Sequence, residues 1–341
     1  MILTVTANPA YDVTYRVERL EVGVTQRVSS VEQRAGGKSV NVCRVLNSLG
    51  TRSVATGFAD AAFAAEAGRD LPVDFVLALP WVRRTLVVSA ADGTTTGLWE
   101  PGAMLADPTA VRQLETRVGE LLPQARGVVI SGSLPRGVDP GLPAELARLA
   151  VAAGVPVICD VDGEALRHAV RVPGVVVMPN ADELQALTGV EAHTPAEVVA
   201  VVRPLLESGV RAVIATRGAD GMVAVTAVGA WSARIPEPVS GNPTGAGDAA
   251  AAAVISGLAT QATDAAGQVR ASDGTRVAAP AFGAPPEPDW PGLLADAVAT
   301  SAAAVAVPVA GEIDHQLRAR LARIVRVEVV GTPELREKSW P

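Results

Sequence analysis

The segment Asn242-Pro243-Thr244-Gly245-Ala246-Gly247-Asp248 runs directly into an alanine-rich stretch at residues 249–258. Gly245 and Gly247 are one residue apart, so the backbone can approach an anion closely. A helix that begins here directs unpaired N–H groups and the positive end of its dipole at the same point. The segment therefore predicts a phosphate site. Asp248 lies at its mouth, where we expect the carboxylate to stay ionised and to accept a proton from an attacking hydroxyl.

The rest of the chain alternates short apolar runs with amphipathic stretches, which indicates an α/β fold. Expected strands lie at residues 2–6, 127–131, 155–160, 175–178, 211–216, 221–226 and 231–235, and expected helices at 140–153, 181–187, 245–258 and 291–306. Such alternation is typical of parallel strands covered by helices on both faces. Ligands of these sheets gather beyond the carboxyl ends of the strands, where Ser131, Asn180 and Thr216 would emerge.

Composition excludes several classes of protein. The chain has 341 residues, of which 49% are hydrophobic and 19% charged, so it can bury a large core. The net charge of −7 and the absence of a Lys/Arg run argue against a nucleic-acid partner. Two cysteines, Cys43 and Cys159, are too few for a disulfide framework, and no apolar run has the length of a membrane span. We therefore expect a cytoplasmic enzyme without a membrane partner.

Two early segments, about 11–35 and 84–105, alternate polar and apolar residues without a helical period. We expect them to pair into a small, separate antiparallel sheet within one domain that spans residues 1–341. The sheet would serve as a lid that excludes water from a reacting site. An extension of the main sheet and a homodimer surface remain alternatives, and a lid can also be the dimer surface. Residues 259–289, rich in Ala, Gly, Pro and Thr, predict a flexible insertion between two helices.

Residues 242–248 resemble the second signature of the PfkB family of ribokinase-like sugar kinases, usually Asp-Thr-x-Gly-Ala-Gly-Asp. Asn242 and Pro243 depart from this pattern, whereas the four residues from Gly245 to Asp248 keep it. The resemblance implies a ribokinase-like three-layer α/β/α sandwich with a mainly parallel central sheet and a small β-sheet lid. It also implies an ATP-dependent kinase, in which Asp248 is the general base and Gly245, Ala246 and Gly247 form an anion hole.

Further segments are similar to the acceptor site of the same family. Residues 4–12 resemble the start of its phosphofructokinase and tagatose-6-phosphate kinase branch, which implies that Asp12 binds sugar hydroxyls. Residues 35–46 resemble the first signature, which implies a hinge at Gly36 and Gly37 and a sugar ligand at Asn41. Lys38 and Lys338 are the only lysines of the chain, which suggests that a compact ammonium is required at Lys38. A turn aspartate and a glycine-capped helix would account for the same residues without a ligand.

The acceptor is expected to be anionic. Residues 131–137 resemble the Gly-Ser-Leu-Pro turn of the phosphosugar branch, which places Ser133 and Arg136 against the acceptor. The lid segment Arg83-Arg84-Thr85-Leu86 is similar to a Thr-Arg-x-Asn strand, in which Arg84 would bind the acceptor phosphate. Leu86, Gly97 and Trp99 replace polar residues of the family pattern, which would suit a different or less polar acceptor.

The nucleotide side is indicated by two other resemblances. Asn180 and Glu183 match an Asn-x-x-Glu element, which implies that they hold, through water, the Mg²⁺ that accompanies the nucleotide. Alone, the same spacing could equally be a helix capping box. Residues 216–221 resemble the family's nucleotide loop, so Thr216, Gly218 and Gly221 are expected to contact ATP; a simple turn would also explain two glycines there.

The function expected from these segments is ATP-dependent phosphorylation of a sugar phosphate of the fructose-1-phosphate, fructose-6-phosphate or tagatose-6-phosphate class. Two alternatives remain open at this point. One is a kinase for an unphosphorylated sugar or a nucleoside. The other is a non-catalytic sensor of sugar phosphates, which the departures at Asn242, Leu86 and Trp99 favour and an intact Asp248 disfavours.

Overall fold

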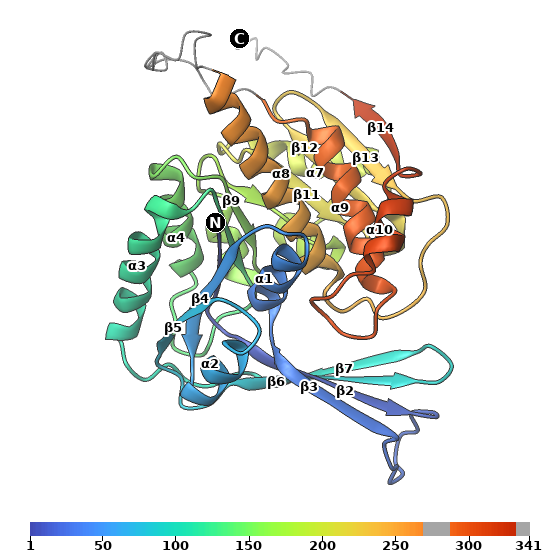
Figure 1. Cartoon of the computed structure of the whole chain (residues 1–341). Helices are drawn as coiled ribbons and strands as arrows, with labels where there is room; N and C mark the ends of the chain where they lie inside the picture. The colour runs from blue at the N-terminus through green and yellow to red at the C-terminus, as the bar shows by residue number, and fades with distance from the viewer. Residues whose placement is uncertain (269–286, 332–341) are drawn as a thin grey trace.

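The computed structural model describes residues 1–268 and 287–331. These residues form a ten-stranded sheet covered by helices on both faces and a separate four-stranded sheet that projects from one end of it (Figure 1). The three-layer α/β/α sandwich expected from the sequence is therefore confirmed. No helix in these two ranges has the length and apolar character needed to cross a membrane.

The large sheet has the strand order β14-β13-β12-β11-β10-β9-β8-β1-β4-β5. From the β5 edge to β11 all neighbouring strands are parallel, and β12, β13 and β14 continue the sheet in antiparallel fashion. Its strands are β1 (Ile2–Thr6), β4 (Ser53–Ala59), β5 (Val73–Leu77), β8 (Gly127–Ser131), β9 (Val157–Asp160), β10 (Val176–Val177), β11 (Ala212–Thr216), β12 (Met222–Thr226), β13 (Ala230–Arg234) and β14 (Arg326–Gly331). The carboxyl ends of the parallel strands meet at one edge, as expected.

The helices pack on the sheet in two layers, because alternate residues of each strand point to opposite faces. Ile2, Val129 and Ile158 join the core under α1, α8 and α9, whereas Leu3 and Val128 join the core under the helices on the other face. The helices are α1 (Lys38–Ser48), α2 (Ala61–Ala67), α3 (Thr109–Leu121), α4 (Leu142–Ala152), α5 (Gly163–Ala169), α6 (Ala181–Thr188), α7 (Pro195–Leu206), α8 (Ala246–Gln268), α9 (Trp290–Val305) and α10 (His315–Leu321), with short 3-10 turns at Leu122–Gln124 and Gly218–Asp220.

The small sheet is the predicted lid, with strand order β3-β2-β6-β7. Its strands are β2 (Ala10–Val17), β3 (Ser30–Gly36), β6 (Arg83–Ala90) and β7 (Thr95–Trp99). The expectation of a wholly antiparallel lid is wrong, because the central strands β2 and β6 run parallel. The physical reason lies in the main sheet: β2 continues from β1 and β6 follows β5, and these two strands are themselves parallel members of that sheet.

The helix that follows the glycine turn is longer than expected. α8 begins at Ala246 and continues to Gln268, so residues 259–268 are helical and do not belong to a loop. Ala-rich composition explains the extension, because alanine is the strongest helix former. Residues 269–286 of the expected insertion lie outside the described residues.

Candidate active site

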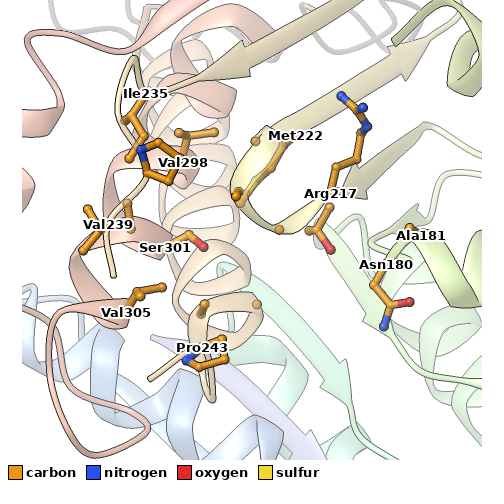
Figure 2. Close-up of a pocket in the computed structure, with 18 of the residues that line it drawn as sticks. Asn180, Ala181, Arg217, Met222, Ile235, Val239, Pro243, Val298, Ser301 and Val305 are labelled. Carbon is orange, nitrogen blue, oxygen red and sulfur yellow. The ribbon is translucent and has the colours of Figure 1, made fainter. Parts of the chain in front are cut away.

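Two adjoining pockets open beyond the carboxyl ends of the parallel strands. The first, about 670 Å³, has walls made mainly of apolar side chains from the segment after β13 and from α9 (Figure 2). The predicted nucleotide residues Asn180, Thr216, Gly218 and Gly221 all line it. The guanidinium of Arg217 is bonded to the backbone oxygen of His193 and so does not reach into the pocket.

The second pocket, about 850 Å³, lies between the lid and the main sheet, and most of the residues that line it are polar or charged. Most of the predicted acceptor residues line it, namely Asp12, Gly37, Lys38, Asn41 and Ser133, and so do Gly245, Gly247 and Asp248 of the predicted catalytic turn. We call it the acceptor pocket, and the first pocket the nucleotide pocket. Asn180, Thr216, Pro243 and Gly247 line both pockets, so the two cavities meet at the glycine turn. The structure therefore brings together residues from distant parts of the chain around the start of α8.

A chain of hydrogen bonds connects the lid to the start of α8. Asn41 Nδ2 donates to Asp12 Oδ2 at 3.0 Å and to Asp248 Oδ2 at 3.2 Å. The other Asp12 oxygen, Oδ1, accepts from Thr85 Oγ1 at 2.6 Å. Gly36 has no side chain because a Cβ there would overlap the Asp12 carboxylate. This arrangement fixes the Asp12 carboxylate in the acceptor pocket through contacts on both of its oxygens.

Asp248 is almost completely buried, with 6% of its surface exposed. Burial raises its pKa from the ordinary value to about 7, and nearby Asp160 acts in the same direction while Lys38 and Asn41 oppose the shift. Desolvation disfavours the charged form, so in the ligand-free site this carboxyl, expected from the sequence to stay ionised, is only partly ionised near pH 7. A carboxyl that titrates near neutrality is suited to proton transfer at physiological pH.

The turn before α8 has the backbone geometry expected of an anion site. Gly245 has φ of 85°, and a Cβ there would press against Ala310 and Gly311, so only glycine fits. The N–H of Ala246 is bonded to Pro243 O at 3.2 Å. Within the described residues, the N–H groups of Gly247 and Asp248 have no hydrogen-bond partner in the protein. These two donors therefore remain available for a ligand.

Lys38 pairs with a carboxylate that the sequence reasoning missed. Its Nζ donates to Asp160 Oδ1 at 3.0 Å and lies 4.0 Å from Glu183 Oε1. Burial alone would lower the pKa of Lys38, but the carboxylates of Asp160, Glu183 and Asp248 raise it above its ordinary value. Lys38 is therefore a charged group in the wall of the second pocket. Asp160 ends β9, and its place at the carboxyl end of a predicted strand was the signal that could have identified it.

Asn180 and Glu183 form the capping box that the spacing allowed. Asn180 Oδ1 accepts from the Glu183 N–H, and Glu183 Oε2 accepts from the Asn180 N–H, both at 2.9 Å. Both residues also line the acceptor pocket, so the capping role does not remove them from the site. Burial raises the pKa of Glu183, whereas Lys38 and the Asn180 N–H lower it.

The structure corrects the arginines assigned to the acceptor. Arg83 and Thr85 line the pocket, whereas Arg84 is exposed and lies on the opposite face of β6. Side chains alternate between the two faces of a strand. A difference of one residue in matching the lid motif to the sequence therefore selects Arg84, on the outer face, instead of Arg83, on the pocket face. Arg136 is also exposed and does not line the pocket; its backbone bonds to Ala103 and Leu105 and so attaches the end of the lid segment to the main domain.

The pockets and the turn between them define a class of protein. An apolar cavity and a charged one that meet at a helix N-terminus suit an enzyme that passes a phosphoryl group between two bound molecules. The chain belongs to the pfkB family of carbohydrate kinases, whose family model matches residues 4–273. It is thus a carbohydrate kinase, as the resemblance implied.

Individual relatives agree with this assignment. The chain is 28% identical over 271 residues to tagatose-6-phosphate kinase of Staphylococcus epidermidis, covering 77% of this chain and 87% of the relative. Phosphofructokinase-2 of Escherichia coli in complex with fructose-6-phosphate superposes with a TM-score of 0.78 at 26% identity, over 94% of this chain and 98% of that one. Ribokinase of Arabidopsis thaliana with ribose and ATP shares the fold, with a TM-score of 0.67 at 20% identity over 94% of this chain and 98% of that one.

Proposed function

We propose that this carbohydrate kinase transfers the γ-phosphoryl group of ATP to a hydroxyl of a sugar phosphate. The fructose-1-phosphate, fructose-6-phosphate and tagatose-6-phosphate class is favoured. The observation that carries the proposal is the buried Asp248 carboxyl at the start of α8, where the acceptor and nucleotide pockets meet. The curated relative is named a tagatose-6-phosphate kinase, and the E. coli structure contains fructose-6-phosphate, which supports this choice of acceptor.

In the proposed reaction, Asp248 accepts the proton of the acceptor hydroxyl as that oxygen bonds to the γ-phosphorus. The bond between this phosphorus and the bridging oxygen breaks, and ADP leaves. The N–H groups of Gly247 and Asp248 stabilise the charge on the transferred group, with the Gly245–Gly247 turn as the anion hole. The burial of Asp248 supports this role, because a pKa of about 7 makes its carboxylate a stronger base than an ordinary aspartate.

The acceptor would lie under the lid. Asp12, held by Asn41 and Thr85, is placed to accept hydrogen bonds from sugar hydroxyls, and Ser133 lines the same pocket. Arg83 is the cation suited to the acceptor phosphate, because its side chain lines this pocket and Lys38 is already paired with Asp160. Burial lowers the pKa of Arg83, whereas Asp12, Asp162 and Glu100 oppose the shift.

ATP would occupy the first pocket, with its base against the apolar walls and its phosphates directed to the glycine turn. Mg²⁺ would neutralise phosphate charge. Asn180 and Glu183 fit a water-mediated contact to this ion: each gives one side-chain oxygen to the capping box, and direct ligation by those oxygens would break the box.

A kinase for an unphosphorylated sugar is the second candidate, because the residues that line the acceptor pocket include two cations, Arg83 and Lys38, and Lys38 is paired with Asp160. A panel of sugars, sugar phosphates and nucleosides, assayed for ADP formation, separates the candidates. We expect turnover with ketohexose phosphates and not with free sugars. Preference for a free sugar would refute the acceptor class, and the absence of turnover with every acceptor would favour a non-catalytic sensor.

Asp248→Asn tests the proposed base. General-base catalysis contributes roughly 10²–10⁴-fold, so turnover should fall by that factor. The KM values for ATP and the acceptor should change little, because Asn preserves the shape of the side chain. Ser240→Ala, which alters a residue that lines only the nucleotide pocket, serves as a control and should retain turnover. Undiminished turnover in Asp248→Asn would remove the residue from the reaction.

The lid offers a surface for a homodimer. On its face away from the acceptor pocket, Tyr15, Val17, Leu86 and Val88 form a small apolar cluster. Val31 and Leu98 border it with 53% and 58% of their surfaces exposed. A second copy would bury these side chains. We expect light scattering to report a dimer that Leu98→Asp disrupts, while Val190→Asp, at an exposed position elsewhere, retains it; a wild-type monomer would refute the dimer.

A further inference from the structure

Trp99 is exposed and is the one aromatic residue among the described residues that line the acceptor pocket, most of which are polar or charged. It is the last residue of β7, the edge strand of the lid, and 66% of its surface is exposed. It pairs in register with Thr85, whose hydroxyl bonds to Asp12. The indole is therefore next to the residues proposed to bind the sugar hydroxyls, and no role has been assigned to it.

The orientation of this indole follows from the glycine two residues earlier. A Cβ added at Gly97 would lie 2.8 Å from Cη2 and 3.0 Å from Cζ2 of Trp99, so the six-membered ring lies over the backbone of Gly97. The ring thus lies along the strand and does not stand up from it. The six-membered ring contacts Gly97 on one side, and with 66% of the Trp99 surface exposed much of the indole is open. A side chain at position 97 would occupy this seat, so Gly97 and Trp99 act as a pair.

The same pairing occurs elsewhere in the chain with a different environment. A Cβ at Gly229 would lie 2.8 Å from the ring of Trp231, which packs against the core under α8 and α9. An aromatic ring that covers a strand glycine is a known packing device and can be purely structural. Trp231 lines neither the nucleotide nor the acceptor pocket, whereas Trp99 lines the acceptor pocket. Packing on a glycine is therefore common to both tryptophans, whereas only Trp99 can contact a molecule bound in the acceptor pocket.

We propose that the open part of the Trp99 indole stacks on a C–H patch of the acceptor's sugar ring, so that the enzyme selects cyclic over open-chain phosphosugars. This inference rests on the proposed function and specifies its substrate. A sugar ring carries C–H groups beside its hydroxyls. Asp12 and Thr85 are placed to bind hydroxyls, and Trp99 is placed to contact a C–H patch of the same ring. Trp99 is thus a determinant of acceptor specificity outside the groups that move the proton or the phosphoryl group.

The test compares two acceptors that differ by ring closure and the water lost in it: a 2,5-anhydrohexitol 6-phosphate, locked in a five-membered ring, and the open-chain hexitol 6-phosphate. The ratio of their kcat/KM values should favour the ring in the wild-type enzyme. Trp99→Ala should reduce this ratio roughly five- to tenfold, the range expected for loss of an aromatic contact. Trp99→Phe should retain most of the preference, and the KM for ATP should be unchanged in both variants.

Two further variants exclude a structural explanation. Gly97→Ala keeps the indole but displaces it from its seat, and it should reduce the ratio in the same direction as Trp99→Ala. Trp231→Ala removes the matched indole outside the pockets and should leave the ratio unchanged. Thermal unfolding identifies any variant that is not folded. An unchanged ratio in folded Trp99→Ala, or a larger ring preference, would overturn the proposal.

Binding can be measured without turnover, which separates this proposal from the proposed function. Tryptophan emission of the wild-type enzyme should change on titration with the locked-ring phosphate, and the change should be lost in Trp99→Phe. This result without any phosphoryl transfer would refute the kinase reaction on such acceptors and keep the stacking role. Phosphoryl transfer together with an emission change that persists in Trp99→Phe would keep the kinase reaction and refute the stacking role.

Discussion

The two pockets differ in how the chain builds them. All residues of the nucleotide pocket come from positions 180–305 and belong to the main sheet and its helices. The acceptor pocket combines residues from positions 8–248, including the lid strands β2, β6 and β7. Its charged groups, among them Asp12, Lys38, Arg83, Asp160 and Asp248, have few counterparts in the apolar walls of the nucleotide pocket. One pocket is suited to selection by shape and the other to selection by charge.

This contrast predicts that changes of protonation act through the acceptor pocket. With a pKa of about 7, Asp248 is increasingly protonated below neutrality, and a protonated carboxyl cannot accept the substrate proton. We expect kcat/KM for the acceptor to rise up to about tenfold per pH unit toward pH 7 and to level off above it. Residual activity of Asp248→Asn should lack this limb, and Arg83→Ala should keep it. A flat wild-type profile between pH 5 and 7 would contradict the assignment.

Neighbouring arginines on opposite faces of one strand sharpen the contrast. Arg83→Ala should raise the acceptor KM by roughly 10- to 100-fold, the value of a charge-assisted hydrogen bond, and leave the KM for ATP nearly unchanged. Arg84→Ala is the matched control, because its side chain is exposed outside the pocket. Steady-state kinetics with both substrates measure the effect. A larger change from Arg84→Ala than from Arg83→Ala would invalidate the observed placement of β6.

A charge in the apolar pocket should have the reverse selectivity. Val239 lines the nucleotide pocket, and Val239→Asp places a carboxylate where it lacks a partner. The KM for ATP should rise about tenfold, and that for the acceptor should stay within about twofold. Val228→Asp, at a position that is 55% exposed and outside the described pockets, should change neither constant. Equal effects of Val239→Asp on both substrates would mean that the two pockets are not independent.

A further effect concerns stability. The pKa of Asp248 is raised in the folded state, so the folded protein binds more protons than the unfolded chain between about pH 4 and 7. The free energy of unfolding of the wild type should therefore fall as the pH rises through this window, by about 1.4 kcal/mol for each unit by which the folded-state pKa exceeds that of the unfolded chain. Asp248→Asn should lack this decline. Chemical denaturation at pH 5 and 8 measures the difference. A variant whose relative stability does not increase with pH would contradict the burial argument.

Much of the main sheet could be predicted from the sequence, because buried parallel strands are short apolar runs with clear ends. β1 and β8 match their expected residues, and the glycine turn predicted the start of α8 within one residue. β14 was missed, because its largely exposed strand carries no continuous apolar run. The parallel pairing of β2 and β6 was missed because strand direction depends on distant segments and not on the alternation within each strand.

The site was predictable where a residue's role follows from backbone geometry, and less so where it depends on side-chain direction. Gly245 and Asp248 lie where the turn placed them. Arg83 and Arg84 are adjacent in sequence, and a shift of one residue in the strand decides which of them enters the pocket. Asp160 required knowledge of which strands are neighbours, since its partner Lys38 is 122 positions away.

The parallel strands β2 and β6 at the centre of the lid carry three of the side chains that line the acceptor pocket. β2 and β6 leave the main sheet in the same direction and carry Asp12, Arg83 and Thr85 on one face. If this sheet moved, Asp12, Arg83 and Thr85 would move together, whereas the residues that line the nucleotide pocket lie outside the sheet. Under the proposed function, a single small sheet carries much of the acceptor preference. Substitutions in this sheet can therefore change the sugar that is accepted without changing the residues that transfer the phosphoryl group.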